Sequence, residues 1–289
     1  MARRRRVDPK LSADLRARLL ERGTREHYED AALYDFEYGD RLEDIEWYVA
    51  LADRLGAARG RPLRLLELGA GTGRISAALL ASGHRVTALD RMAPMLRRLE
   101  EKIRDPEARE RLEVVEGDMV EPPVPREAFD LVIAPFNALM HLYTHDALRR
   151  CFAGARRALV SGGTFAFDVM LPDLEWLTLD PDERHSVTYF NHPETGERLV
   201  YSTNHTYDPS TQVCHIRLFY DEAPRRPWPF RPPPAPKQLV HLAHRQIFPE
   251  ELRALLTHVG FTLEEHSGDF VGAPLAEGIE SQVVRCRAP

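Results

Sequence analysis

An apolar run that ends in three closely spaced glycines, 63-LRLLELGAGTGR-74, constrains the fold more than any other part of the sequence. The run is typical of a strand buried on both faces, as in parallel sheets. Gly69, Gly71 and Gly73 allow positive φ and close approach of a ligand to the backbone. The free N–H groups at the start of the next helix would face that ligand. The stretch predicts an α/β protein with a ligand near this turn, but a glycine turn alone does not identify the ligand.

Strands and helices alternate after this turn. The apolar pattern predicts helices over 93–103 and 144–160, with Thr144 as the N-cap of the second. It predicts a further helix over 249–260, with Pro at its start and Gly at its end. The predicted strands are 63–69, 85–90, 112–118, 130–136, 163–171, 261–270 and 280–287. This order predicts a doubly wound parallel sheet with helices on both faces.

The chain divides into a core and two additions. Residues 1–60 are predicted to form an N-terminal helical lid, and the first ten of them are expected to be a frayed basic tail. The core is expected over 61–171 and 249–289. Between these parts, period-two runs within 186–222 predict an antiparallel β insertion over 172–248. The insertion contains a proline-rich segment over 223–236, which we expect to be a stiff exposed loop.

Composition narrows the class of partner. The 289 residues carry a net charge of −6, so no overall basic field favours nucleic acid or an anionic membrane. No apolar run approaches the length of a membrane span. Cys151, Cys214 and Cys286 form no CxxC pair, and we expect buried thiols in a reducing compartment, the cytoplasm.

Acidic residues follow three predicted strands, at the edge where doubly wound sheets bind ligands. Asp90 comes 21 residues after Gly69 and could accept both ribose hydroxyls of a nucleoside. Asp118 could reach an exocyclic amine of adenine, although either aspartate could also be only a helix cap. The G-x-G-x-x-G/A pattern of dinucleotide-binding proteins would need Gly or Ala at position 74, where this sequence has Arg. Glu67 would repel a pyrophosphate and suits a ligand that carries an ammonium group.

Four segments together resemble the class I S-adenosylmethionine-dependent methyltransferases: 65-LLELGAGTGR-74, 86-VTALD-90, 116-EGDM-119 and 129-FDLVIAPFNALMHL-142. The resemblance implies a Rossmann-like seven-stranded sheet of order 3-2-1-4-5-7-6, with an antiparallel strand 7 over 280–287. It also implies S-adenosylmethionine as the cofactor and S-adenosylhomocysteine as its product. The residues that it implies for cofactor binding are Glu67, Gly69, Ala70, Gly71, Gly73, Arg74, Asp90, Arg91, Met92, Asp118, Met119, Pro135 and Asn137.

Two residues are candidates for catalysis. His141 follows the fourth strand, where the family places residues that face the methyl group, and it could take a proton from the nucleophile. Alternatively, it fixes its loop by hydrogen bonding. Tyr34, with Tyr28 and Tyr38, could form a lid over the sulfonium or only pack the N-terminal helices. No third ligand accompanies His141 and His145, so we expect no metal.

The acceptor is less constrained than the cofactor. The loop 135–139 lacks the [DN]PP[YF] pattern of methyltransferases that act on nucleic-acid bases and glutamine. The β insertion is similar to that of amino-sugar N,N-dimethyltransferases and glycine N-methyltransferases, in which it covers the acceptor or forms a dimer contact. This similarity implies a small-molecule acceptor with an N or O nucleophile, and it leaves a homodimer open. Five residues of the insertion could line the pocket or face solvent: Tyr189, His205, Tyr207, His215 and Arg217.

Two other functions stay open at this point. One is an NAD-dependent oxidoreductase, which Arg74 and the Gly117-Asp118 pair disfavour. The other is a protein with the same fold and cofactor site that does not transfer methyl groups.

Overall fold

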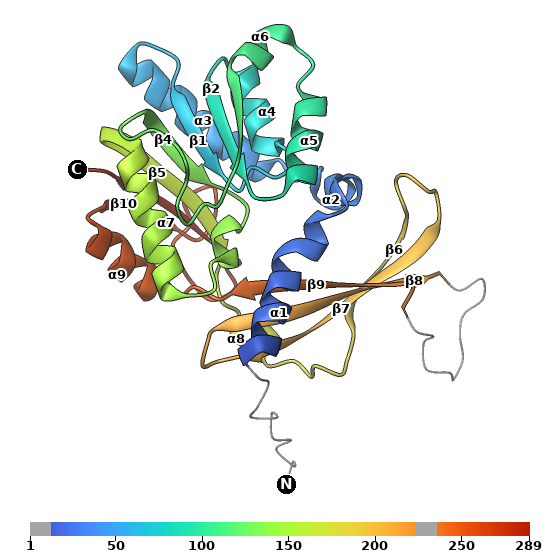
Figure 1. Ribbon diagram of the computed structural model, residues 1–289. Coiled ribbons are helices and arrows are strands. Elements are labelled where there is room, and N and C mark those ends of the chain that lie inside the picture. The colour runs from blue at the N-terminus through green and yellow to red at the C-terminus, as the bar shows by residue number, and fades with distance from the viewer. Residues whose placement is uncertain (1–12, 224–235) are drawn as a thin grey trace.

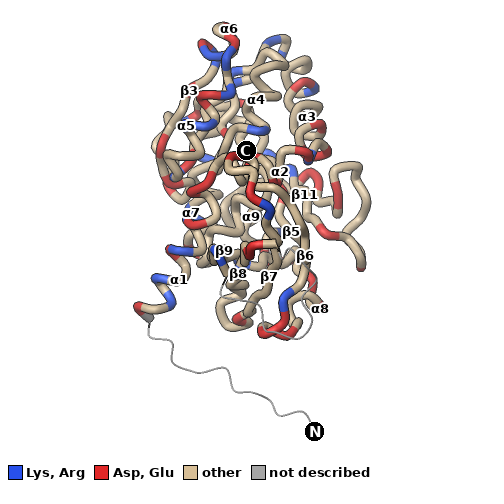
Figure 2. The backbone as a smooth tube through the Cα atoms, turned by 90° about the vertical axis from the view of Figure 1, so that its right-hand side faces the viewer, with Lys and Arg blue, Asp and Glu red and all other residues tan. Residues whose placement is uncertain are grey.

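The computed structural model describes residues 13–223 and 236–289 and contains two β-sheets with helices around them (Figure 1). The larger sheet has seven strands and the smaller has four. The smaller sheet lies below the larger one in both perpendicular views (Figures 1 and 2). The basic segment 1–10 and nearly all of the proline-rich segment 223–236 lie outside the described residues.

The seven-stranded sheet has the order β10-β11-β5-β4-β1-β2-β3, which confirms the predicted arrangement. β11 runs antiparallel to both β5 and β10, while the other pairs are parallel. β11 is therefore the antiparallel seventh strand of the predicted order. The strands are β1 (Arg64–Leu68), β2 (Arg85–Asp90), β3 (Leu112–Glu116), β4 (Phe129–Ala134), β5 (Leu159–Met170), β10 (Thr262–Ser267) and β11 (Ser281–Arg287).

Both faces of this sheet are covered by helices, as the apolar strands predict. Successive residues of a strand point to opposite faces, so Leu65 packs on one side and Leu66 on the other, and both are fully buried. The helices on the Leu65 side are α3 (Glu43–Arg59), α4 (Arg74–Ala81) and α5 (Ala93–Lys102). Those on the Leu66 side are α7 (His145–Ala158) and α9 (Pro249–Val259). The short α6 (Pro106–Glu110) precedes β3.

The local signals at the helix ends are confirmed. The Thr144 side chain caps α7 by accepting a hydrogen bond from the Ala147 amide. α9 begins at Pro249 and ends before Gly260, which has a φ of 91°. β5 begins four residues earlier than predicted, because Leu159 already pairs with Phe129 before an irregularity in the register. The three cysteines are buried and free.

The insertion forms an antiparallel sheet of order β6-β7-β8-β9. Its strands are β6 (His185–Asn191), β7 (Arg198–Asp208), β8 (Val213–Glu222) and β9 (Gln238–Arg245), and the short helix α8 (Leu174–Leu177) comes before them. The hairpin of β7 and β8 is as predicted. β9, which follows the proline-rich segment, was not predicted.

The N-terminal helices connect the two sheets. They are α1 (Ala13–Arg25), the 3₁₀ turn η1 (Glu26–Tyr28) and α2 (Ala31–Tyr38). α1 crosses the smaller sheet (Figure 1), and it lies so close to β9 that a Cβ at Gly23 would be 2.6 Å from that of Ala243. The Glu26 carboxylate accepts a 2.8 Å hydrogen bond from the His241 amide. On the other side, Asp35 accepts a 2.9 Å hydrogen bond from Arg98 of α5.

Candidate functional site

A cavity of about 1400 Å³ lies between the carboxyl edge of the seven-stranded sheet, the N-terminal helices and the smaller sheet. Its lining comes from parts of the chain that are far apart in sequence: α2, the loop after β4, the end of β5, α8, β9 and the loop between β10 and β11. The carboxyl edge is where doubly wound sheets bind their ligands. This cavity is therefore the candidate site.

The three glycines of the turn beside the cavity have different roles: some are needed for packing, and one leaves space for a ligand. Gly69, Gly71 and Gly73 have φ values of 74°, 56° and 77°, all in the left-handed region. A Cβ at Gly69 would lie 2.9 Å from the Ala138 Cβ, and one at Gly73 would lie 2.4 Å from the Leu99 Cγ. A Cβ at Gly71 would meet no atom within 4 Å. Two of the glycines are thus needed for packing, whereas Gly71 borders open space in which a ligand could lie against the backbone.

Asp90 ties the end of β2 to the glycine turn. Its Oδ2 accepts a hydrogen bond from the Gly71 amide and its Oδ1 one from the Met92 amide, both 2.8 Å long. Burial of the carboxyl raises its pKa above the usual value. The N-cap of α5 is Met92, so Asp90 is not the N-cap of this helix.

The residues predicted beside Asp90 have different surroundings. Arg91 is exposed, and its guanidinium lies 3.8 Å from the Glu21 carboxylate of α1. Asp118 is also exposed and accepts a 2.8 Å hydrogen bond from the Val120 amide. Met119 packs against the core on the α7 side. Asp118 therefore has a free second carboxylate oxygen at the end of β3, within the described part of the chain.

Glu67 has a partner inside the protein. Its side chain is buried, and its Oε2 accepts a hydrogen bond from the Ser76 hydroxyl of α4. Burial raises the pKa of this carboxyl to about 8. Glu67 is therefore largely protonated at neutral pH as long as Ser76 is its hydrogen-bond partner and no cation lies beside it.

Arg74 pairs with the N-terminal segment. Its guanidinium donates a 2.7 Å hydrogen bond to Oδ1 of Asp44 and a second bond to Oδ2, and another at 2.8 Å to the Arg41 carbonyl. It also lies 5.1 Å from the ring centre of Phe136. Asp44 and Phe136 line the cavity, and Arg74, which does not line it, holds a positive charge next to Asp44.

The loop after β4 has an unusual backbone. Phe136 and Asn137 are consecutive non-glycine residues in the left-handed region, with φ of 52° and 64°. The Phe136 amide donates a 2.9 Å hydrogen bond to Asp168, and Asn137 Oδ1 accepts one of 2.7 Å from the Met170 amide. Pro135, just before them, is buried. Such strain is found at ligand sites where neighbouring contacts hold it in place.

Asp168 was missed by the sequence analysis. It lies in β5, lines the cavity and accepts a 2.7 Å hydrogen bond from the Tyr48 hydroxyl. Burial raises its pKa to about 6. An acid inside a buried strand was the signal that drew attention to Glu67, and the same signal would have found Asp168.

The predicted tyrosine lid lies over the cavity. Tyr28, Tyr34 and Tyr38 line it together with His27, and the ring centres of Tyr34 and Tyr38 are 4.8 Å apart. Burial raises the pKa of Tyr34 far above its usual value, so its hydroxyl stays protonated. The structure thus places Tyr34 at the wall of the candidate site.

His141 lies behind this wall and does not line the cavity. Its Nε2 is 2.6 Å from the Tyr28 hydroxyl and its Nδ1 is 3.5 Å from that of Tyr143. Burial lowers its pKa well below the usual value, so the ring is neutral. His244 of β9, whose ring centre is 5.0 Å away, does line the cavity. The alternation of β9, which puts Leu242 and His244 on one face, could have identified it.

The insertion contributes other residues than those suggested from sequence. None of Tyr189, His205, Tyr207, His215 and Arg217 lines this cavity. His205 stacks on Trp176 at 3.8 Å, and Arg217 donates a 2.8 Å hydrogen bond to the Pro181 carbonyl. Suggesting them for the pocket was wrong, because β9 and α8 form this wall instead.

The lining is strongly acidic. It contains eight carboxylates and one arginine: Asp40, Glu43, Asp44, Asp168, Asp173, Glu175, Glu277, Glu280 and Arg41. Two of these acids, Glu277 and Glu280, come from the loop between β10 and β11, although Glu280 was expected as the first residue of a strand. Such an excess of negative charge favours a cationic ligand.

Two negative findings concern the described residues alone. Residues 13–223 and 236–289 contain no group of three or more His, Cys, Asp or Glu side chains that could hold a metal ion. Within the same ranges, no helix is both long and apolar enough to span a membrane.

Comparison with known proteins identifies the domain. Residues 65–163 match a family described as "Methyltransferase domain". Two uncharacterized methyltransferases, from Geobacillus thermodenitrificans and Geobacillus kaustophilus, are 27% identical over 172 residues. These residues are 59% of this chain and 74% of each relative.

Solved structures share the fold over nearly their whole length. The CcbJ methyltransferase of Streptomyces caelestis has a TM-score of 0.68 at 24% identity and covers 87% of this chain and 98% of its own. CalS10, an amino pentose methyltransferase of Micromonospora echinaspora determined with S-adenosylmethionine bound, has a TM-score of 0.60 at 19% identity, covering 89% and 96%. KedS8, a sugar N-methyltransferase from Streptoalloteichus, has a TM-score of 0.60 at 19% identity, covering 87% and 91%.

The methyltransferase domain over residues 65–163 supports the first function inferred from the sequence. The chain is an S-adenosylmethionine-dependent methyltransferase with a Rossmann-like fold.

Proposed function

We propose that this S-adenosylmethionine-dependent methyltransferase transfers the methyl group to the nitrogen of a small amine. The observation that carries the proposal is the cavity lining, with eight carboxylates and one arginine. A protonated amine is attracted to such a cavity, whereas a neutral alcohol gains nothing from the charge. The volume of about 1400 Å³ accommodates a small molecule beside the cofactor.

The residues of the carboxyl edge fit the cofactor that the family uses. We assign the open backbone at Gly71 to the methionine end, together with Gly69, Ala70 and Gly73. The two carboxylate oxygens of Asp90, which now accept backbone hydrogen bonds, would accept the ribose hydroxyls. For the adenine and the ribose next to it, we assign Arg91, Met92, Asp118 and Met119.

Charge complementarity guides the assignment at the methionine end. This part of the cofactor is a zwitterion, and the ion pair of Arg74 with the cavity-lining Asp44 offers one charge of each sign nearby. Glu67 remains our proposal for the ammonium group. Because burial raises its pKa to about 8, binding of the ammonium group to Glu67 would favour loss of the Glu67 proton. Pro135 and Asn137 would fix the loop that faces the methyl group.

S-adenosylmethionine supplies a methyl group on a sulfonium, which is a good leaving group. The protein has to align the acceptor nitrogen, exclude water and receive a proton. The ring faces of Tyr34 and Tyr38 would stabilise the positive charge. The bound ammonium first gives up one proton, which frees the lone pair of the nitrogen. As the N–C bond then forms and the C–S bond breaks, the nitrogen becomes a methylated ammonium and the sulfonium becomes the neutral thioether of S-adenosylhomocysteine.

Two histidines are candidates to receive that proton. His141 is neutral but lies behind the cavity wall, with both of its ring nitrogens near tyrosine hydroxyls. His244 lines the cavity and makes no hydrogen bond to any residue of the described ranges. We keep His141 as a proposed base, acting through Tyr28, and add His244 as the one that can contact the acceptor directly.

The names of the structural neighbours support an amine. CalS10 acts on an amino pentose and KedS8 is a sugar N-methyltransferase. At 19% identity these names do not transfer by themselves, but the acidic cavity is an independent reason. A homodimer formed through the smaller sheet stays a prediction, which light scattering coupled to size-exclusion chromatography would test.

A matched-pair screen tests the acceptor class. Amino sugars and other small amines are incubated with methyl-labelled S-adenosylmethionine beside analogues in which a hydroxyl replaces the amine. We expect label transfer to amines and at least about tenfold less to the hydroxyl analogues, which corresponds to about 1.4 kcal/mol. Preferential labelling of alcohols or carboxylic acids would exclude the amine and leave the methyltransferase activity in place.

A further inference from the structure

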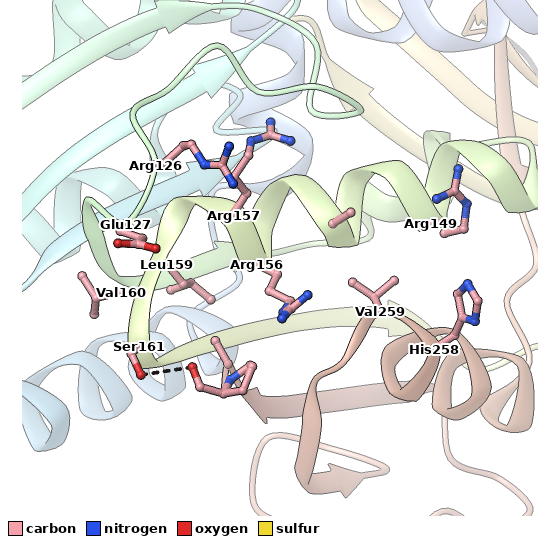
Figure 3. A pocket seen from close by; sticks show the side chains of 13 residues that line it. Arg126, Glu127, Arg149, Arg156, Arg157, Leu159, Val160, Ser161, His258 and Val259 are labelled. Atoms are coloured by element: carbon pink, nitrogen blue, oxygen red, sulfur yellow. Dashed lines mark hydrogen bonds between the residues drawn. The ribbon is translucent and has the colours of Figure 1, made fainter.

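A second pocket of about 460 Å³ lies at the opposite edge of the seven-stranded sheet (Figure 3). It is formed where β4 and β5 begin, whereas the methyl-transfer cavity is formed where they end. Its basic lining residues are Arg126, Arg149, Arg156, Arg157 and His258, and the acidic side chain among its lining residues is Glu127.

The basic side chains come from three separate elements. Arg126 precedes β4, Arg149, Arg156 and Arg157 belong to α7, and His258 lies in the last turn of α9. In the view of Figure 3, the guanidinium groups of Arg126 and Arg157 are drawn above α7 and that of Arg156 below it. Arg149 and His258 lie together at the far end.

Most of these charges are not neutralised by neighbours. Arg149 pairs with Asp146 at 2.7 Å. Within the described ranges, Arg126, Arg156 and Arg157 make no side-chain hydrogen bond or ion pair. By contrast, the buried Asp130 carboxylate has Arg59 and Arg61 within 3.3 Å and 2.7 Å.

The helix dipole explains only part of this cluster of basic residues. Arginines in the last turn of a helix interact favourably with its dipole, which accounts for Arg156 and Arg157 singly. It does not account for Arg126, which comes from a loop and lines the same pocket as Arg157. Like charges that line one pocket repel, and a bound anion would offset this repulsion.

We propose that this pocket binds a small phosphate-bearing anion with two or more phosphate groups. Guanidinium groups form paired hydrogen bonds with phosphate oxygens, and Arg126 and Arg157 offer two such groups on one side. His258 is the aromatic ring in the lining, so the pocket offers little stacking surface for a nucleobase. Recognition would rest on the phosphates, at a site separate from that of methyl transfer.

The test is calorimetric titration of the full-length protein with inorganic pyrophosphate at low ionic strength. We expect Arg126→Gln/Arg157→Gln to weaken binding at least about tenfold, and Glu127→Gln to strengthen it about threefold, because it removes the repelling charge. ADP should bind within about threefold of pyrophosphate, since the base adds little. The control Arg97→Gln/Arg104→Gln removes two exposed charges on the other side of the sheet and should leave the affinity unchanged.

Three results would overturn the proposal. One is the absence of binding at millimolar pyrophosphate, and another is equal weakening in the control variant. The third is a single-stranded RNA that binds at least about tenfold tighter than pyrophosphate and loses this affinity in Arg126→Gln/Arg157→Gln, which would indicate a nucleic-acid surface. S-adenosylhomocysteine affinity, measured in every variant, shows that the fold is intact.

Discussion

The two edges of the seven-stranded sheet differ in charge although they share the same buried strands. The carboxyl edge faces a cavity lined by eight carboxylates and one arginine, and the amino edge faces a pocket lined by four arginines and one glutamate. The strands themselves contribute little to this difference, because their side chains are mostly apolar and buried. The chemistry of each edge therefore comes from the connecting segments, and each edge can be altered without the other.

The largest expected effect separates the packing glycines from the ligand-facing one. Gly73→Ala should lower the free energy of unfolding by about 3 kcal/mol, since its Cβ would overlap Leu99 and its φ is positive. Gly71→Ala meets no atom within 4 Å and should cost only about 1 kcal/mol, yet it should weaken cofactor binding at least about tenfold. Urea denaturation and calorimetry measure the two quantities. Equal stability losses would show that Gly71 is also a packing residue.

Asp90 should show the largest effect on the cofactor. Asp90→Ala should reduce the affinity for S-adenosylhomocysteine about a hundredfold, because two hydrogen bonds to a carboxylate are lost. The matched variant at the amino edge, Arg126→Gln/Arg157→Gln, should leave this affinity unchanged. Unaltered affinity in Asp90→Ala would disprove the ribose assignment.

Glu67 should make the stability of the carboxyl edge depend on pH. Its pKa rises from 4.5 to about 8 on folding, so its contribution is fully present below pH 4.5 and is lost as the pH rises to 8. Glu67→Gln can still accept the Ser76 hydrogen bond. The free energy of unfolding of Glu67→Gln should therefore rise by about 2 kcal/mol relative to that of the native protein as the pH increases from 6 to 8.

Cofactor binding sharpens the Glu67 prediction. Bound S-adenosylhomocysteine should reduce the difference between native protein and Glu67→Gln at pH 8, because its ammonium group would favour the ionised carboxylate. Thermal unfolding with and without ligand, from pH 5 to pH 9, measures this. If the ligand does not change the stability difference between the native protein and Glu67→Gln, Glu67 does not bind the ammonium group.

The smallest effect concerns the mouth of the cavity. Glu277→Gln/Glu280→Gln should raise the KM for an amine acceptor about threefold at low salt and less at high salt, since exposed charges act weakly and are screened. The kcat should not change. An equal rise in KM for a neutral acceptor would show that these residues act by shape and not by charge.

The ligand edge could be predicted from local signals in the sequence, whereas the sheet order was implied by the family resemblance. The strand run before Gly69 and the spacing to Asp90 are readable without knowing the neighbours, and so is the cap at Thr144. The structure brings these residues to one edge as expected. Which cofactor atoms they contact remains a prediction.

The acceptor side was less predictable because it depends on which face of each strand is covered. Alternation in the insertion gives two faces, and a shift of one residue exchanges them. His205 was therefore considered for the pocket while His244 was overlooked. The loop between β10 and β11 has no periodic signal, so Glu277 and Glu280 could be found only from the folded chain.

The N-terminal helices hold the two sheets by bonds of different kinds. Toward the smaller sheet, α1 packs tightly at Gly23, and Glu37 accepts a 2.8 Å hydrogen bond from the Tyr220 hydroxyl. Toward the core, Asp35 forms ion pairs with the partly exposed Arg98 and Lys102, whereas Tyr28 makes a neutral hydrogen bond to His141. Salt screens the ion pairs and leaves the neutral bonds almost unaffected. Product release should therefore depend on ionic strength only as far as it requires the Asp35 end of these helices to leave the core.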